Sequence, residues 1–220
     1  MYDAIPRNTS INLKQNFEIM EGNNTMCRLK NATLEQVATR TFVLDAVREN
    51  GLNLQYAGHF RSDREVVIEA VRQNGLALRY AENELSKDRE IVLMAVSQNG
   101  EILHSVSGLY GSDKEVVVAA VLNKGIAIKD ASEELKNDED VVFTAFCQDA
   151  DSIRYAGRKI RSDREFMLKI VRMNGEVVRY AEGMAYRDEE VIISAIKNNR
   201  DAIKHVDLFA LRDILLRALG

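Results

Sequence analysis

The sequence has few cysteines: Cys27 and Cys147 are the only two among 220 residues. Two thiols cannot build a disulfide framework, which predicts a reducing, intracellular compartment with both thiols unreactive. Long apolar runs are also missing, because none approaches the roughly 20 residues that cross a bilayer. The first residues, 1–7, lack the basic segment and apolar stretch of a secretory signal. A water-soluble, cytoplasmic protein is therefore expected.

Motifs of known catalytic sites are missing as well. The sequence contains no phosphate-binding Gly-x-x-x-x-Gly-Lys-Ser/Thr loop, no His-Glu-x-x-His zinc pair and no Gly-x-Ser-x-Gly nucleophile elbow. Its three histidines, His59, His104 and His205, lie far apart, and its acidic clusters do not match a calcium loop with a central glycine. We therefore expect no enzyme activity, no cofactor and no metal site. A formal net charge of -4 argues against bulk attraction to nucleic acid.

What the sequence does contain is a repeat. An aspartate recurs every 25 residues through most of the chain: Asp63, Asp88, Asp113, Asp138, Asp163, Asp188 and Asp213. Such regular spacing is typical of a stacked repeat array, in which each unit packs on its neighbours and cannot bury a core alone. Thr39 takes the place of the aspartate one unit earlier, so we count seven repeats over residues 39–212.

The first half of each repeat predicts an α-helix. In the repeat that begins at Asp63, the carboxylate can accept hydrogen bonds from the free amides of the first turn, and Glu65 lies at the positive end of the helix dipole. The apolar residues gather on one helical face: Val66, Val67, Ala70 and Val71, with Ile68 widening it. A helix with so wide an apolar face is expected to be sandwiched between neighbours.

The second half of each repeat predicts another amphipathic helix. Asn74 and Gly75 end the first helix, and glycine is expected there because it adopts the left-handed conformation of a helix C-terminus without steric cost. Glycine occupies the same place at Gly51, Gly100, Gly125 and Gly175. Leu78, Ala81 and Leu85 then follow at helical spacing. We predict an all-α fold, an α-solenoid of about seven 25-residue helix-turn-helix repeats with degenerate terminal caps.

Three segments follow from this period. Residues 1–38 are expected to form an N-terminal segment and a degenerate capping repeat, because residues 29–32 echo residues 78–81. Residues 39–212 form the seven-repeat solenoid. Residues 213–220 are either a C-terminal capping helix or a truncated eighth repeat that begins at Asp213.

The repeat pattern resembles that of a known family. Asp-x-Glu-Val-Val-x-x-Ala-Val-x-x-Asn-Gly-x-x-Leu-x-Tyr-Ala, present at residues 63–81 and in varied form at later aspartates, resembles the repeats of the DUF4116 family. Two residues depart from this pattern: Ala150 and Arg200 stand where the pattern has glycine. The family has no known function and implies no catalytic residue. Its repeats occur in protists and in amoeba-associated bacteria such as Legionella, where they resemble parts of secreted effectors, which implies a host cytosol as the alternative location.

Six residues of the middle repeats are candidates for a partner-binding surface. At two outer positions of the first helix the other repeats carry charge, as at Glu69 and Arg72, but three consecutive repeats carry none. The residues there are Met94, Ser97, Ala119, Leu122, Thr144 and Cys147. An apolar patch with a polar rim is typical of a protein-binding surface. The alternatives are packing between layers, or drift on a permissive surface.

Six residues of the second helices are candidates for an anion-binding track. At one repeat position they would stack into a basic column: Arg79, His104, Lys129, Arg154, Arg179 and Lys204. Such a column suits an acidic peptide, a phosphorylated ligand or nucleic acid. A parallel acidic column lies on the first helices: Glu65, Glu90, Glu115, Asp140, Glu165 and Glu190. The alternative is that the two columns pair between layers, at about 0–1 kcal/mol for each exposed pair.

An extended repeat surface without catalytic motifs favours a non-catalytic protein-interaction scaffold, with a protein partner that the sequence does not identify. The family resemblance implies that it is part of a bacterial effector acting in a host cell. The alternative is an anion binder that uses the basic column for nucleic acid or phosphoinositide, and the net acidity disfavours nucleic acid.

Overall fold

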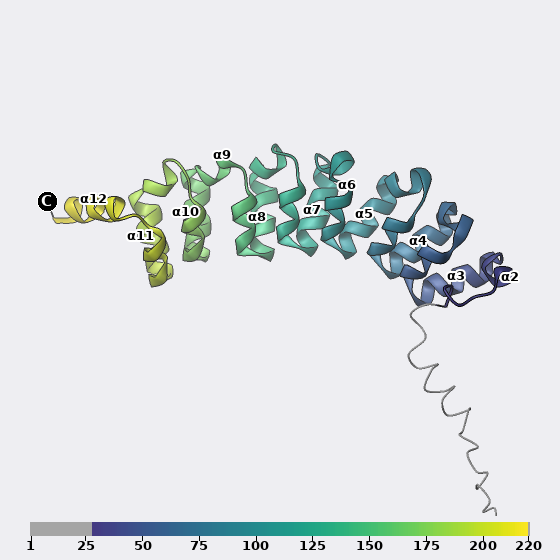
Figure 1. The fold of residues 1–220 in the computed structure, drawn as a ribbon. Coiled ribbons are helices and arrows are strands. Elements are labelled where there is room, and N and C mark those ends of the chain that lie inside the picture. Colours follow the sequence, from purple (N-terminus) through teal and green to yellow (C-terminus); the bar gives the residue numbers. More distant parts are fainter. Residues whose placement is uncertain (1–27, 220) are drawn as a thin grey trace, which may run out of the picture. The chain divides into compact units, whose positions relative to one another are not determined.

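The computed structural model describes residues 28–219, so the predictions for residues 1–27, including Cys27, lie outside the described residues. Within that range every regular element is helical, and α-helices alternate with short 3-10 helices (Figure 1). The chain divides into two compact units, Met1–Leu85 and Ser86–Gly220. This all-α repeat architecture is the predicted solenoid class.

The first unit holds the helices of the first two repeats. Its elements are α2 (Leu34–Val37), α3 (Arg40–Glu49), η2 (Gly51–Tyr56), η3 (Gly58–Ser62), α4 (Arg64–Gln73) and η4 (Gly75–Tyr80), with η5 (Asn83–Lys87) following. Helix α3 packs against α4. Before them, Thr33 and Gln36 form a reciprocal capping box that begins α2. The described part of the N-terminal segment thus contains one short helix.

The second unit holds the remaining repeats. Its elements in chain order are α5 (Arg89–Gln98), η6 (Gly100–Ile102), α6 (Leu103–Tyr110), α7 (Lys114–Asn123), η7 (Gly125–Asp130), η8 (Leu135–Asn137), α8 (Glu139–Gln148), η9 (Ala150–Tyr155), α9 (Arg158–Arg161), α10 (Arg164–Met173), η10 (Gly175–Tyr180), η11 (Ala185–Arg187), α11 (Glu189–Asn198), η12 (Arg200–His205) and α12 (Leu208–Leu219). Helix α7 packs between α5 and α8, and α10 packs against α11.

The first helix of each repeat forms as its sequence predicts. At α7 the Asp113 carboxylate accepts hydrogen bonds from the backbone N–H groups of Glu115 (3.1 Å) and Val116 (3.2 Å). The inward face of α7 is fully buried at Val116, Val117, Ala120 and Val121. Thr39 occupies the cap position of α3, but its hydroxyl donates to a backbone carbonyl one turn earlier and caps no amide.

The second half of the repeat is helical, as predicted, but it consists of short elements and not of one continuous helix. In most repeats it begins with a six-residue 3-10 helix, and in the repeat that begins at Asp88 a short 3-10 turn leads into the α-helix α6. In η4, Ala77 N donates to Asn74 O (2.9 Å) and Ala81 N donates to Leu78 O (3.1 Å). The Asn74 side chain accepts from Leu76 N, so η4 begins directly after α4 ends. A 3-10 helix closes its bonds over fewer residues than an α-helix, which suits so short a segment. In both geometries residues at i and i+3 share a face, so the apolar spacing cannot distinguish them.

Glycine at the start of this element has a different role from the predicted one. Among the described glycines, positive φ angles occur at Gly58 and Gly183, so the left-handed helix end predicted for Gly100 and its equivalents is wrong. The first helix ends instead in extended backbone, with φ -144° at Asn99. A Cβ at Gly100 would lie 2.4 Å from the carbonyl oxygen of Ala120 in the next repeat. The same close approach recurs at Gly51, Gly125 and Gly175. Glycine is therefore required because two layers approach closely.

Two polar contacts add to this glycine contact between neighbouring first helices. Asn123 Oδ1 accepts from Gly100 N at 2.8 Å, and Asn123 Nδ2 donates to a carbonyl at the end of α5. Where a cation follows the cap residue it reaches the next repeat, as Arg89 does with Asp113 (2.7 Å) and Glu115 (2.7 Å). We call the glycine, amide and cation contacts together the inter-repeat ladder. Hydrogen bonds and ion pairs of this kind are directional, so they fix how one layer sits on the next.

The last helix begins earlier than predicted. Helix α12 begins at Leu208, and the Asp207 carboxylate accepts from Ala210 N at 2.7 Å. Asp213 therefore lies inside α12 and does not begin a helix, which moves the start of the predicted C-terminal segment from residue 213 to about 208. Asp207, six residues before Asp213, accepts from an amide of the first turn and takes the capping role.

Candidate functional site

The six residues predicted as a partner site lie on three helices that are consecutive in the stack, α5, α7 and α8. Each helix contributes two positions three residues apart, and such residues share one side of a helix. We call this strip the uncharged face: Met94, Ser97, Ala119, Leu122, Thr144 and Cys147. Leu122 is 53% exposed at its centre. Ser97 and Cys147 are exposed too, whereas Met94, Ala119 and Thr144 are half-buried.

Three further apolar side chains, Leu93, Val118 and Phe143, border the same strip and were missed by the sequence analysis. All three are half-buried. The repeat position is that of Ile68, which the sequence analysis assigned to the inward face because it widens the apolar arc. The signal that could have found them is their spacing: each stands four residues before the second strip residue of its helix, which places it at the edge of the strip.

The two hydroxyl groups of the uncharged face are already satisfied. Ser97 Oγ donates to Leu93 O and Thr144 Oγ1 donates to Asp140 O, each at 2.7 Å. Both bonds return the side chain to a carbonyl one turn earlier in its own helix. Neither hydroxyl proton therefore needs water or a partner, and covering these groups costs less than covering unpaired donors.

The same helix positions are charged in the first unit. There Arg48 Nε donates to Glu69 Oε2 at 3.0 Å, and Arg72 also pairs with Glu69. Such a network holds its charged groups together and keeps the surface polar. The contrast indicates that this repeat position tolerates ion pairs, and that the middle repeats differ by their residues and not by a lack of room.

Cations border the uncharged face on the side of α10. The Lys169 ammonium lies 3.9 Å from the centre of the Phe143 ring and 3.2 Å from Glu139 Oε1. Arg172 donates to Glu190 Oε1 at 2.8 Å. An ammonium over an aromatic ring is a favourable contact and covers part of that ring. The apolar strip therefore ends at a polar rim.

Four carboxylates of the acidic column on the first helices pair with cations outside the basic column. Glu65 pairs with Arg40, Glu115 with Arg89, Asp140 with Lys114, and Glu190 with Arg164 and Arg172. These cations belong mostly to the inter-repeat ladder, at the residue after each cap. For these four carboxylates the predicted pairing with the basic column is not the arrangement found, because nearer cations satisfy them.

The basic column pairs instead with acids of the second elements. His104 Nδ1 lies 2.8 Å from Asp130 Oδ1, and Lys204 pairs with Asp201. Arg154 stacks on Tyr155, with 4.6 Å between its guanidinium carbon and the ring centre. Lys129 and Arg79 are exposed. Because several members have anionic partners in the same layer or the next, the column presents less net positive charge than its sequence suggests.

Arg179 shows how closely one of these cations is held. The Tyr180 hydroxyl donates to Asp151 Oδ1 at 3.0 Å, and Arg179 pairs with the same carboxylate. The Tyr180 hydrogen bond, helped by Arg179, holds the pKa of Asp151 below its usual value. A carboxylate kept ionised between two donors neutralises the arginine, which weakens its attraction for an external anion.

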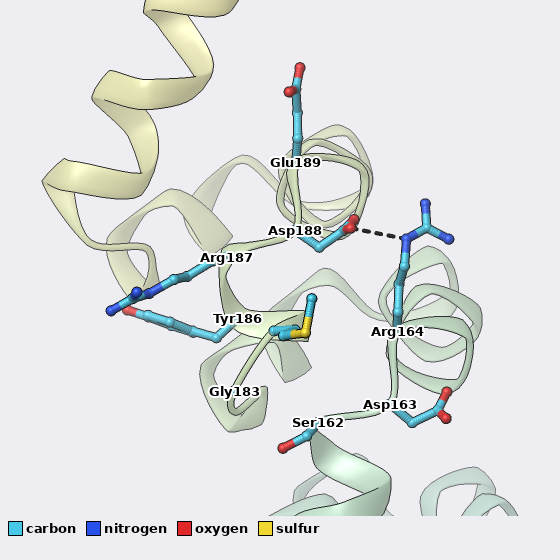
Figure 2. A pocket seen from close by; sticks show the side chains of 9 residues that line it. Ser162, Asp163, Arg164, Gly183, Tyr186, Arg187, Asp188 and Glu189 are labelled. Carbon is cyan, nitrogen blue, oxygen red and sulfur yellow. Dashed lines mark hydrogen bonds and ion pairs between the residues drawn. The ribbon is translucent and has the colours of Figure 1, made fainter.

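An open depression of about 910 Å³ lies on the second unit between residues 162–164 and the segment 183–189 (Figure 2). At its rim Arg164 Nε donates to Asp188 Oδ2 at 2.9 Å, and Arg164 also pairs with Glu190. Met184 is 85% exposed beside it. The arginine here already serves the inter-repeat ladder, and the lining holds no nucleophile with an adjacent base.

The three histidines are not brought together. His59 rests on the ring of Phe60 in the first unit, His104 faces Asp130, and His205 Nε2 lies 3.0 Å from Glu176 Oε2. Over residues 28–219 no group of three or more histidine, cysteine, aspartate or glutamate side chains is arranged to hold a metal ion. Of the helices in that range, none has both the length and the apolar content to cross a membrane.

These features define a class: an all-α repeat protein whose layers are joined by a recurring polar ladder. The model of the family described as a domain of unknown function, DUF4116, matches residues 39–86, 63–110, 113–161, 138–184 and 163–212. The matches overlap and together cover most of the chain, so the protein belongs to the DUF4116 family. Neither the curated proteins nor the solved structures contain a match to this chain.

Proposed function

We propose that this protein is a non-catalytic protein-interaction scaffold, and that the uncharged face of α5, α7 and α8 is its partner-binding site. The observation that carries the proposal is Leu122, which is 53% exposed at the centre of a strip whose hydroxyl groups are internally satisfied. Fully burying a leucine side chain is worth about 1.5–3 kcal/mol, so covering its exposed part is favourable.

The partner that fits this face is a protein segment with apolar side chains opposite Leu122 and polar groups at its margins. The strip runs across three helices and carries no charge, so it offers no ionic contact to a small charged ligand. Its rim includes the ion pairs of Lys169 with Glu139 and of Arg172 with Glu190, which suit polar residues at one end of the bound segment.

The test compares capture by three forms of the protein: the natural chain, Leu122→Asp and Leu109→Asp. Leu109 is 61% exposed on α6 and lies outside the uncharged face, so it is a matched control. We expect the natural chain and Leu109→Asp to capture the same partner from host-cell lysate. Leu122→Asp should weaken capture by about 30-fold or more, because a charge at the centre of an apolar contact costs about 2 kcal/mol or more.

A second measurement uses the exposed thiol of Cys147 in a Cys27→Ser background. Partner binding should slow the reaction of this thiol with a maleimide, because the partner covers it. Equal capture by Leu122→Asp, equal loss with Leu109→Asp, or an unchanged thiol reaction with the captured partner bound would each contradict the proposed site.

The second candidate function is an anion binder that uses the basic column. The exposed Lys129 and Arg79 support it, whereas the internal pairing of Arg179 and Lys204 weakens it. Retention on heparin at low salt, with a steep loss as salt rises, would favour this function because phosphate and sulfate contacts release counterions. Passage through heparin at low salt would exclude it.

The resemblance to effector repeats also supports a proposal about where the protein acts. We infer that the scaffold is part of a bacterial effector that acts in the cytosol of a host cell. A translocation reporter fused to the chain, followed in infected amoebae, checks this separately from partner binding. Reporter signal confined to the bacteria would contradict it.

A further inference from the structure

The inter-repeat ladder is complete between α10 and α11. A Cβ at Gly175 would lie 2.3 Å from Ala195 O, so these layers approach as closely as α5 and α7 do. Gly175 N donates to Asn198 Oδ1 at 2.7 Å. Arg164 pairs with Asp188 at 2.9 Å and with Glu190. The same three contacts therefore recur at distant places in the second unit.

Between α8 and α10 all three ladder residues are replaced. Ala150 takes the place of glycine, Met173 takes the place of the amide side chain, and Glu139 takes the place of the cation. Alanine carries the Cβ for which the other layers leave no room, and methionine cannot replace the paired donor and acceptor of an amide. Glu139 carries the same charge as the cap of the next repeat, Asp163, so it cannot bridge to it.

The two helices also stand farther apart than their neighbours do. Helix α8 packs closely on α7, and α10 packs closely on α11, but α8 and α10 lack such close backbone packing. Figure 1 shows α10 set apart from α8. Helices α8 and α10 carry larger buried side chains than most repeats have at the same positions: Phe146, Phe166 and Ile170. Apolar contacts are not directional, so they hold the layers together without fixing the angle between them.

The opposite edge of this junction keeps its polar contacts. Glu182 N donates to Arg161 O at 2.9 Å, and the Arg161 guanidinium pairs with the Glu182 carboxylate at 2.7 Å. Asp151 of the earlier repeat accepts from Tyr180 of the later one. One edge is thus held by directional bonds, while at the edge with α8 and α10 the three ladder residues are replaced and Lys169 of α10 reaches Glu139 and Phe143 of α8.

We propose that the junction between α8 and α10 is a joint, about which residues 163–212 turn relative to residues 86–162. The bonds around Glu182 act as the hinge, and the loss of the directional ladder contacts between α8 and α10 permits small changes of angle. Hinge motion at a few positions between rigid bodies is a common way for proteins to adapt to a partner. This inference is independent of the proposed function, because it rests on the junction alone.

The experiment measures distance distributions between paired spin labels in the full chain with Cys27→Ser. One pair joins Ser97→Cys on α5 to Cys147 on α8 and spans ladder junctions. The other joins Cys147 to Lys197→Cys on α11 and spans the joint. All three sites are exposed and share one repeat position, and each pair spans two repeats. We expect the pair across the joint to give a distribution about twofold broader than the control pair.

A second variant introduces two of the three replacements at a junction that has the complete inter-repeat ladder. Arg89→Glu with Asn123→Met removes the cation and the amide between α5 and α7, and should broaden the distribution of the Ser97→Cys and Cys147 pair. Circular dichroism checks that this variant remains folded. Equal widths for the two pairs in the natural background would overturn the joint. An unchanged width in a folded transfer variant would overturn the ladder as its cause.

Discussion

Gly100→Ala tests the close approach of two layers, and the structure allows its cost to be worked out. The added Cβ would lie 2.4 Å from the Ala120 carbonyl oxygen and 3.1 Å from the Lys124 Cβ. The oxygen belongs to the backbone of a packed helix, so side-chain rotation cannot relieve the clash. Overpacking of this kind costs about 1–3 kcal/mol. Alanine also restricts the unfolded chain, which offsets about 0.4–1 kcal/mol. The net loss of stability should be about 1–2 kcal/mol.

The matched control is Gly108→Ala in the same repeat. Gly108 lies inside α6, and an added Cβ there meets nothing within 4 Å. Alanine should therefore stabilise the protein by about 0.5–1 kcal/mol, because glycine is unfavourable inside a helix. Urea denaturation followed by circular dichroism gives both free energies of unfolding. If Gly100→Ala shifts the midpoint in the same direction as Gly108→Ala, the close approach is not what requires glycine.

The other predictions concern single residues of the same unit. Ala120→Glu should lower stability by about 3–5 kcal/mol, because Ala120 is fully buried and the new charge has no partner there; an unchanged thermal melting temperature would show that the core assignment is wrong. Asp113→Ala should cost about 0.5–2 kcal/mol in urea denaturation through the lost helix cap, and a neutral result would contradict the capping role. The hydrogen bond from Arg89 lowers the pKa of Asp113 below its usual 3.8, so this stabilisation is complete above pH 3.8 and is lost as the pH falls through the lowered pKa. Asp113→Asn should therefore make stability less sensitive to acid over that window, as acid titrations of the unfolding midpoint would show.

The first helices are predictable because their signals are local. Asp113 bonds to amides two and three residues away, and the buried positions of α7 follow from spacing along the same ten residues. The regular period of the aspartates also predicts that the repeats stack, because each apolar face must be covered by the neighbouring repeat. The candidate site was also visible in part, because loss of charge at Leu122 and its equivalents is a property of the sequence. Its edge residues, such as Phe143, were missed because half-burial depends on what the neighbouring helix covers.

Sequence alone determined the repeat length, the caps, the inward faces and the helical class, all of which depend on contacts within a few residues or on exact repetition. Only the tertiary structure decided the role of Gly100, which is set by a carbonyl oxygen twenty residues away in the next layer. It also decided which acid pairs with which cation: Arg89 pairs with Asp113 of the next repeat, whereas Arg179 pairs with Asp151 of the previous one. The consequence of the replacements at Glu139, Ala150 and Met173 is likewise set by the tertiary structure. Each removes a contact that exists only when two repeats are stacked.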